Sequence, residues 1–242
     1  MRALSATLSG SGAPYSPLAK VDLMVLSWSG GKDSALALWV LREESRTPPV
    51  ALLTTVTEEY ERVSMHGVRR ALLRRQADAT GLPLVEVEIP PECSNEVYET
   101  RLGGVFASAE LRGAEEVAFG DLFLEDIRAY RESRLAAAGK RGCFPLWGRD
   151  TNELASCFLN AGFRAIVVCV DPSMLDSSFA GREYDKELLH DLPEGVDPCG
   201  ENGEFHTFVY DGPVFVEPIR CRRGEVVERD RFVFSDLLEA EP

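Results

Sequence analysis

The sequence has no long apolar run and no pair of cysteines at the spacing used by common metal or redox sites. No apolar stretch approaches the length of a membrane span, and the first 20 residues lack the apolar core of a secretory signal. The six cysteines form no C-x-x-C pair, which argues against a zinc knuckle or a thioredoxin-like site. We therefore expect a cytoplasmic protein with reduced thiols and no membrane partner.

Positive charge is also scarce in this chain. There are 26 Lys and Arg against 40 Asp and Glu, which gives a formal net charge of -14. A surface built to hold nucleic acid needs an excess of Lys and Arg, so nucleic acid is disfavoured as a partner. The 242 residues, 45% of them hydrophobic, suffice for one or two globular domains.

Apolar strand-like runs alternate with helical runs from residue 21 onward. This alternation predicts an α/β fold with a parallel sheet covered by helices on both faces. After residue 172 the alternation of strands and helices becomes less regular. Residues 177–192 are predicted as one helix, and residues 214–234 as a β-hairpin that turns near Gly224. The predicted strands are 21–28, 49–56, 82–90, 115–122, 143–147 and 164–172, and the predicted helices between them are 34–45, 66–81, 95–113, 124–139 and 151–162.

One polar loop interrupts the first strand–helix pair. It is not a Walker A loop, because Leu26 stands where that motif has its first glycine and Asp33 where it needs Ser or Thr. The physical logic of phosphate binding still applies, since glycines let phosphate oxygens approach backbone N–H groups at a helix N-terminus. The loop consists of Ser29, Gly30, Gly31, Lys32, Asp33 and Ser34.

The side chains of this loop suit a nucleotide. Ser29 and Ser34 can donate hydrogen bonds to phosphate, and Lys32 can neutralise its charge. Asp33 can hold Mg²⁺ or cap the following helix. The plainer alternative is a strand-to-helix turn with Lys32 in solvent, but the string is too specific for a generic turn.

The string Ser-Gly-Gly-Lys-Asp-Ser resembles the PP-loop of the ATP pyrophosphatases, whose signature is Ser-Gly-Gly-x-Asp-Ser after the first strand. The resemblance implies an adenine-nucleotide α-hydrolase-like fold. It also implies that ATP is cleaved between its α and β phosphates, and that the loop binds the β and γ phosphates.

Four further strings are similar to the branch of that superfamily that contains the diphthine–ammonia ligases. They are MHGVR, FGDLFLEDIRAYRE, FPLWGRDTNEL and VDPCGENGEFHTFVYDGP, at residues 65–69, 119–132, 144–154 and 196–213. The similarity implies a PP-loop ATP-binding domain at 21–140 and a smaller α+β substrate domain at 141–242. Residues 1–20 are expected to be a mobile leader.

Gly120 and Asp121 end the fourth predicted strand. In an open parallel sheet, ligands bind beyond the carboxyl ends of the strands where the strand order reverses. With the order 3-2-1-4-5, strands one and four flank that crevice, and the two residues would face the loop at Ser29–Ser34. The alternative for Asp121 is an N-cap of the following helix.

Three basic residues are candidate substrate contacts. Arg128 and Arg131 are three apart on one predicted helix, so they share a face that could receive phosphate or a carboxylate. The alternative is a face paired with Glu125 and Glu132. His66 opens a predicted helix, and could contact nucleotide or substrate or serve as a cap.

The string CGENGEFHTF places Glu201, Asn202, Glu204 and His206 within six residues. If it enters a strand, Glu204 and His206 share one face. Such groups suit a cationic substrate, a proton taken from ammonium, or a metal. The alternative is a loop whose acids bind backbone amides. For Cys199 we favour a packed thiol over a nucleophile.

The resemblance as a whole implies an ATP-dependent carboxylate–ammonia ligase that forms an acyl adenylate, AMP and pyrophosphate. Its cofactors would be ATP and Mg²⁺, and its amine donor ammonium. The acceptor would be a diphthine-bearing translation factor or a small carboxylate, and a homodimer is left open. The alternatives are a PP-loop ligase with another acceptor, a tRNA-modifying enzyme and a non-catalytic nucleotide sensor.

Overall fold

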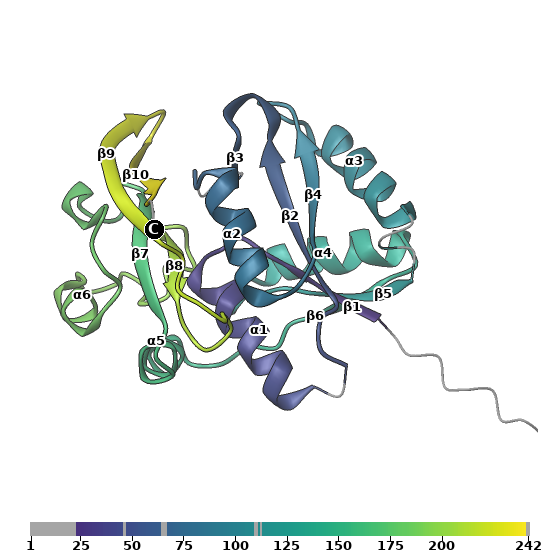
Figure 1. Cartoon of the computed structure of the whole chain (residues 1–242), viewed down its shortest axis with the longest axis horizontal. Coiled ribbons are helices and arrows are strands. Elements are labelled where there is room, and N and C mark those ends of the chain that lie inside the picture. Colours follow the sequence, from purple (N-terminus) through teal and green to yellow (C-terminus); the bar gives the residue numbers. More distant parts are fainter. Residues whose placement is uncertain (1–22, 46, 64–66, 109–110, 112, 241–242) are drawn as a thin grey trace, which may run out of the picture.

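The computed structural model describes residues 23–45, 47–63, 67–108, 111 and 113–240. The expected leader at 1–20 therefore lies outside the described residues. The chain forms two sheets with helices between and around them (Figure 1). Within the described ranges, no helix combines the length and the apolar character that a membrane crossing needs.

The larger sheet is parallel except for one short strand. Its order is β4-β2-β1-β5-β6, the arrangement in which the first and fourth long strands are neighbours at a crevice. The short strand β3 (Arg62–Val63) pairs antiparallel with the end of β2. The parallel strands are β1 (Leu23–Ser27), β2 (Ala51–Thr57), β4 (Leu84–Ile89), β5 (Ala114–Ala118) and β6 (Arg141–Cys143).

Helices cover both faces of this sheet, as the alternating pattern predicts. Successive residues of β1 point to opposite faces, so Leu26 packs with α1 and α2 while Val25 packs with α3 and α4. The α2 helix ends where Gly81 adopts φ +73°, which favours glycine. The helices are α1 (Lys32–Glu44), α2 (Arg70–Thr80), α3 (Asn95–Ala107) and α4 (Glu125–Ala137).

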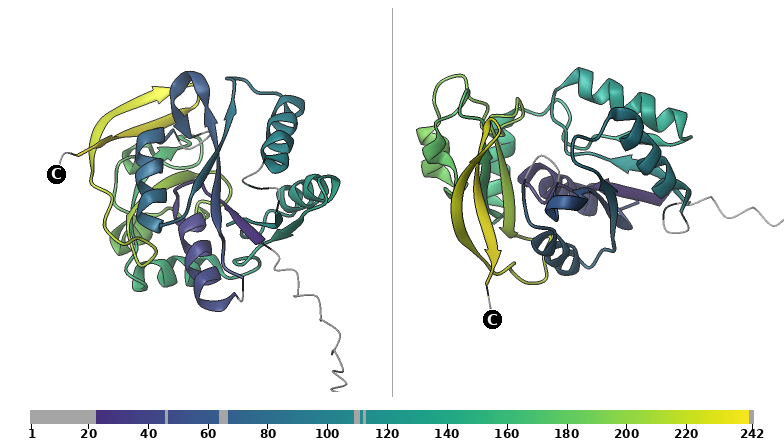
Figure 2. Two further views of the ribbon diagram at one scale, coloured as in Figure 1. Left: turned by 45° about the vertical axis from the view of Figure 1, so that its right-hand side comes forward. Right: turned by 90° about the horizontal axis from the view of Figure 1, so that it is seen from above.

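The smaller sheet is antiparallel, with the order β8-β7-β10-β9. The α1 and α2 helices lie between the two sheets (Figure 2), and their apolar side chains share one core with Phe158, Val167 and Phe208. The strands of the smaller sheet are β7 (Arg164–Val170), β8 (Phe205–Asp211), β9 (Cys221–Arg229) and β10 (Phe232–Glu239). The helices that accompany it are α5 (Thr151–Asn160), α6 (Lys186–Asp191) and the 3-10 turn η2 (Ser177–Phe179), whereas the 3-10 turn η1 (Glu58–Tyr60) connects β2 to β3 of the larger sheet.

Several local predictions were wrong. The strand at 164–172 does not extend the parallel sheet, because β7 pairs antiparallel with β8 and β10. The single helix at 177–192 is two short pieces, since Gly181 has φ +84° and Glu183 bridges to Ile166. The hairpin is confirmed, but its turn is at Asp230 (φ +54°), and β9 runs straight through Gly224.

Two smaller expectations also change. The strand near residue 143 is β6 (Arg141–Cys143), and the following residues form a turn instead of continuing it. The N-cap of α4 is Leu124 and not Asp121, because five residues separate the end of β5 from Leu124 and Asp121 pairs with Arg131.

Candidate functional site

The loop at Ser29–Ser34 connects β1 to α1. Gly30 has φ +78°, and a Cβ there would lie 2.5 Å from Gln76 Oε1, so this position requires glycine. Gly31 is the N-cap of α1 and has ordinary backbone angles. A Cβ at Gly31 would lie 3.1 Å from the Thr207 carbonyl oxygen, so both glycines allow close approach of other groups.

Hydroxyl groups hold this loop in shape. Ser29 Oγ accepts a hydrogen bond from Gly31 N at 3.2 Å, and Ser34 Oγ donates to the Gly31 carbonyl at 2.9 Å. The two hydroxyl oxygens are 3.2 Å apart. The loop is therefore preformed at the N-terminus of α1, where backbone N–H groups and the helix dipole favour an anion.

Gly120 brings the end of β5 against the same loop. A Cβ at Gly120 would lie 2.8 Å from the Asp33 carbonyl carbon and 3.0 Å from Ser34 N. Only glycine allows two backbones to approach this closely. The structure thus brings Gly120 to the predicted crevice between β1 and β5.

Asp121 forms an ion pair with Arg131 of α4. Arg131 Nε lies 2.7 Å from Asp121 Oδ2, and Arg131 Nη2 donates to Oδ1 at 3.1 Å. The guanidinium group also lies over the Phe119 ring, 4.3 Å from its centre. Burial raises the pKa of Asp121, and the positive charge of Arg131 opposes this shift.

Arg128 occupies a different environment from Arg131. It pairs with Glu132 at 2.8 Å, and its guanidinium lies over Phe144 and Trp147, 4.8 and 4.7 Å from the ring centres. Cation–π contacts of this kind hold the plane of a guanidinium in place. The two arginines thus share a helix but have separate partners.

Lys32 is nearly fully buried, with 4% of its surface exposed. Its amine donates to both oxygens of Asp33, at 2.9 and 2.8 Å, and to the carbonyl of Cys199. It also lies 6.0 and 5.7 Å from the ring centres of Tyr184 and Phe205. Burial by itself lowers the pKa of Lys32, but the charge and hydrogen bond of Asp33, together with the charges of Cys199 and Glu201, outweigh it, so the pKa is raised.

The segment from Asp197 to Glu204, called here the C-terminal loop, is held by its own carboxylates. Asp197 Oδ1 accepts from Cys199 N at 2.8 Å and from Glu201 N at 3.3 Å. Glu204 is 1% exposed, and its Oε1 accepts from Asp197 N at 3.0 Å and from Asn202 Nδ2 at 2.9 Å. In this structure Glu204 and Asn202 therefore brace the loop.

Glu201 turns from this loop toward the segment just after β5. Its Oε1 accepts from Leu122 N, just beyond β5, at 2.8 Å. Burial raises the pKa of Glu201 to about 7; the Leu122 N–H opposes the shift, and the charges of Asp33 and Asp121 add to it. A carboxylate with such a pKa can accept and return a proton near neutral pH.

Strand β8 joins the two loops. Thr207 Oγ1 accepts from Lys32 N at 3.0 Å, and Val209 N donates to the Gly30 carbonyl at 2.9 Å. On the same strand, burial and then the charge of Lys32 lower the pKa of His206 to about 4, so its imidazole is neutral at pH 7. His66 lies outside the described residues.

Two residues of this arrangement were not found from the sequence. Gln76 of α2 donates to the carbonyls of Gly30 and Val209, at 2.9 and 2.6 Å, and accepts from Trp28 Nε1 at 3.1 Å. Thr207 is the second. Neither has a sequence signal beyond its polarity inside an apolar pattern, and Gln76 is fully buried.

The thiol of Cys199 is not poised for attack. It is buried, its Sγ donates to the Thr151 carbonyl at 3.4 Å, and burial raises its pKa to about 12. The thiol therefore stays protonated at neutral pH, where a nucleophile would need the thiolate. All six cysteines are free.

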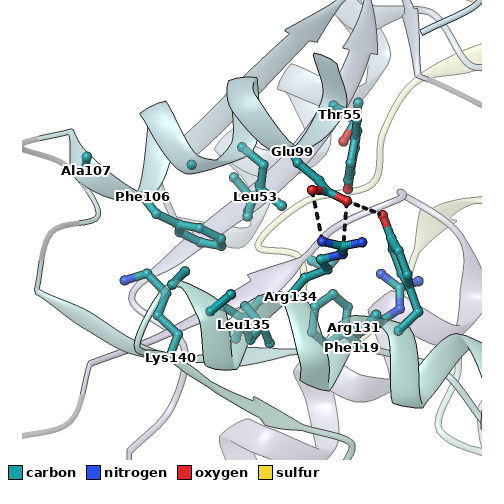
Figure 3. Close-up of a pocket in the computed structure, with 18 residues that line it drawn as sticks. Leu53, Thr55, Glu99, Phe106, Ala107, Phe119, Arg131, Arg134, Leu135 and Lys140 are labelled. Carbon is teal, nitrogen blue, oxygen red and sulfur yellow. Dashed lines mark hydrogen bonds and ion pairs between the residues drawn. The ribbon is translucent and has the colours of Figure 1, made fainter. Parts of the chain in front are cut away.

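A cavity of about 560 Å³ lies between α3, α4 and the parallel sheet (Figure 3). Ser27, Thr55 and Phe119 line it from the carboxyl ends of β1, β2 and β5. Arg134 pairs with Glu99 across the cavity at 2.9 Å, and Arg131 and Lys140 also line it. The walls thus combine apolar surface with cationic groups.

The residues present fit a magnesium ion only if a ligand supplies most of its coordination. Among the described residues, no three His, Cys, Asp or Glu side chains gather as a metal site. Asp33 offers one carboxylate that is 31% exposed in the first turn of α1. Mg²⁺ commonly binds through one or two carboxylates together with substrate phosphates and water.

Comparison with known proteins gives the family. The model of the diphthamide synthase N-terminal domain matches residues 22–141, and that of the C-terminal domain matches residues 150–236. A diphthine–ammonia ligase from Danio rerio is 27% identical over 86% of this chain and 90% of its own length. Another from Schizosaccharomyces pombe is 30% identical over 47% of this chain and 20% of its own length.

Among solved structures, a predicted subunit of tRNA methyltransferase from Methanocaldococcus jannaschii is similar to 81% of this chain and 99% of its own, at 16% identity and with a TM-score of 0.43. The two domain matches follow each other over most of the described residues. The chain therefore belongs to the diphthamide synthase family of PP-loop ATP pyrophosphatases, which includes the diphthine–ammonia ligases.

Proposed function

We propose that this protein joins a carboxylate to ammonia at the crevice between the Ser29–Ser34 loop and the C-terminal loop. Family membership gives the reaction class, an ATP-dependent amide-forming ligase. The observation that carries the proposal is the position of Glu201. Its carboxylate accepts a hydrogen bond from Leu122 N beside the preformed Ser29–Ser34 loop. Residues 21–140 would bind ATP, and residues 141–242 would supply the acceptor pocket.

ATP would bind across the carboxyl edge of the parallel sheet. The β and γ phosphates would lie at the N-terminus of α1, where Gly30 and Gly31 allow close approach. The nucleoside would reach over β1 toward the cavity behind Ser27 and Thr55. Gly120, which has no side chain to hold the two segments apart, would keep the chain just beyond β5 against this loop.

Asp33 would hold Mg²⁺ together with the phosphates, and the ion would help to neutralise the departing pyrophosphate. Lys32 would take part in the same stabilisation. Its amine already lies between Asp33 and the Cys199 carbonyl, so its charge sits at the junction of the two loops. The acceptor carboxylate would attack the α-phosphorus, form an acyl adenylate and release pyrophosphate.

The second step needs ammonia, whereas ammonium dominates in neutral water. We assign the removal of that proton to Glu201, whose pKa of about 7 lets it accept a proton at neutral pH. The nitrogen then bonds to the acyl carbon, and the bond from that carbon to the phosphate oxygen of AMP breaks. The second proton leaves the nitrogen for solvent, which completes the amide.

The roles of the other candidates follow from their surroundings. His206 is neutral at pH 7 and would help to position the amine or the acceptor without adding charge. Arg131 and Arg128 would orient the nucleotide or the acceptor from α4. Glu204 and Asn202 would shape the pocket, because their polar atoms hold the C-terminal loop. For the acceptor, we propose a diphthine-bearing protein, as the names of the relatives indicate.

The decisive experiment is product analysis with ATP, ammonium and a diphthine-bearing protein. We expect AMP and pyrophosphate in equal amounts with the amide. ADP and orthophosphate would exclude adenylation. ATP binding without any product would favour a nucleotide sensor. As a control, Gly31→Val should abolish the rise in thermal midpoint that ATP and Mg²⁺ give, since its side chain meets the Thr207 carbonyl.

A further inference from the structure

The amine of Lys32 occupies a small cage inside the protein. It donates hydrogen bonds to both carboxylate oxygens of Asp33, at 2.9 and 2.8 Å, and to the Cys199 carbonyl. The rings of Tyr184 and Phe205 lie on the amine as well, with their centres 6.0 and 5.7 Å from its nitrogen. We call the Asp33 carboxylate, the Cys199 carbonyl and these two rings the Lys32 cage.

The cage has the features that recognise an ammonium group. A carboxylate neutralises the positive charge, a carbonyl accepts a hydrogen bond, and aromatic faces attract a cation within about 6 Å. Tyr184 and Phe205 are both 2% exposed and Cys199 is 4% exposed, so little water competes for the amine. The Tyr184 hydroxyl also donates to the Pro198 carbonyl at 2.7 Å, which fixes its ring against the C-terminal loop.

Lys32 uses every hydrogen of its amine inside the cage. The charged amine has three hydrogens, and the two oxygens of Asp33 and the carbonyl of Cys199 accept them. Under the proposed function, Lys32 also stabilises the pyrophosphate that leaves ATP, and a phosphate oxygen needs at least one of these hydrogens. The amine must therefore give up cage acceptors when it turns to the phosphates, which vacates a site matched to its size and charge.

We propose that the Lys32 cage binds the substrate ammonium ion once Lys32 has moved to the phosphates of bound ATP, an inference that rests on the proposed function. A free ammonium ion carries the same charge as the lysine amine, so the exchange leaves the charge inside the cage unchanged. Its fourth hydrogen takes the direction in which the lysine side chain now leaves the nitrogen. Asp33 has two oxygens, so one can contact Mg²⁺ while the other holds ammonium.

The cage also lies close to the proposed proton acceptor. Glu201 belongs to the same C-terminal loop as Cys199 and is two residues further along the chain. Its charge is among those that raise the pKa of Lys32, so it acts on the space that the amine now fills. An ammonium ion in the cage is thus within electrostatic reach of Glu201. The arrangement predicts an order of binding in which ammonium follows ATP.

The first measurement replaces the lysine amine by a free one. Lys32→Ala removes the occupant and leaves the cage, so ammonium or methylammonium chloride should raise its thermal midpoint by about 2–4 °C relative to sodium chloride. Lys140→Ala is the matched control, because the described residues give Lys140 a carbonyl and the Phe106 ring but no carboxylate. The midpoint of this control should not respond to ammonium. An equal response of Lys32→Ala to sodium and ammonium overturns the assignment.

The second measurement uses the unaltered protein, so it does not depend on the folding of Lys32→Ala. Ammonium should raise the midpoint by a similar amount when α,β-methylene-ATP and Mg²⁺ are present, and not in their absence. Tyr184→Leu should reduce this rise, whereas Tyr184→Phe, which keeps the ring, should retain it. A rise of the same size without nucleotide would place ammonium elsewhere and overturn the proposal.

The stabilisation by the nucleotide alone is measured first, because it separates this proposal from the proposed function. If the nucleotide does not stabilise the protein, the proposed function fails. If it does, but ammonium adds nothing, Lys32 does not leave the cage and only the cage proposal is overturned. Neither measurement requires that an amide forms.

Discussion

The nucleotide loop at Ser29–Ser34 and the C-terminal loop at Asp197–Glu204 are equally polar and rich in glycine, yet they are built differently. The first is shaped by hydroxyls within its own six residues and by the helix that follows it. The second is shaped by carboxylates that bind its own backbone and by Glu201, which reaches across to Leu122. Both loops therefore use polar side chains to fix their own backbone, the first through hydroxyls and the second through carboxylates.

The largest expected effect tests the junction of the two loops. Lys32→Met keeps the length of the side chain over Tyr184 and Phe205 but removes the charge between Asp33 and the Cys199 carbonyl. We expect adenylation to fall by about 10²–10³, the usual effect of removing one donor that stabilises a transition state. ATP-dependent pyrophosphate release measures it, and Lys186→Met is the control. A near-normal rate would remove Lys32 from the chemistry.

Glu201→Gln tests which loop supplies the base. Glutamine can still accept from Leu122 N but cannot take a proton, so we expect amide formation to fall about 10²-fold while ATP affinity is kept. In the unaltered protein, the rate of the amide step should rise with pH through about 7 as the Glu201 carboxylate forms. A variant that keeps its rate and its pH profile would contradict the assignment.

Glu204→Ala tests the bracing role of the other acid. It removes the acceptor of Asp197 N and Asn202 Nδ2 inside the loop, which should cost about 2–3 kcal/mol in the free energy of unfolding. Denaturant titration measures this cost. Glu204→Gln keeps an acceptor and should be milder in both stability and activity. If Glu204→Gln is stable but loses amide formation as Glu201→Gln does, Glu204 is a chemical group as well.

The pKa of Glu201 also predicts a pH dependence of stability. Between about pH 4.5 and 7 the folded protein keeps the proton that the unfolded chain has lost, so raising the pH lowers the free energy of unfolding. Glu201→Gln lacks this titration. Its stability relative to the unaltered protein should therefore rise across that range, by on the order of 1–3 kcal/mol. Parallel denaturant titrations at pH 5 and pH 8 check the sign.

The smallest effect concerns the contact between strand β8 and the nucleotide loop. Thr207→Val conserves shape but leaves Lys32 N without its hydroxyl acceptor, which should cost about 1 kcal/mol of stability. ATP affinity, measured by calorimetry, should change little because phosphate can take over that N–H. A large loss of affinity would show that β8 sets the loop conformation for ATP.

Much of the Ser29–Ser34 loop and its surroundings follows from the sequence. Gly30 takes a positive φ and Gly120 allows two backbones to touch, and a glycine in the sequence marks positions of both kinds. The alternating apolar runs also predicted the parallel sheet, and the strand order 3-2-1-4-5 that was assumed for it places β1 beside β5, as the structure does. These features depend on local backbone geometry and on side-chain periodicity, which the sequence displays directly.

The tertiary structure decided what the sequence left open. Glu201 and Glu204 are three residues apart with the same chemistry, and only long-range packing turns one toward Leu122 and the other into its own loop. Gln76 and Thr207 joined the site for the same reason, because their partners come from distant segments. The sequence by itself determined where other groups can approach the backbone closely, because glycine is visible in it. The packing of β8 and the C-terminal loop on α1 determined which side chains surround that point, since hydrogen-bond partners are set by distance in space.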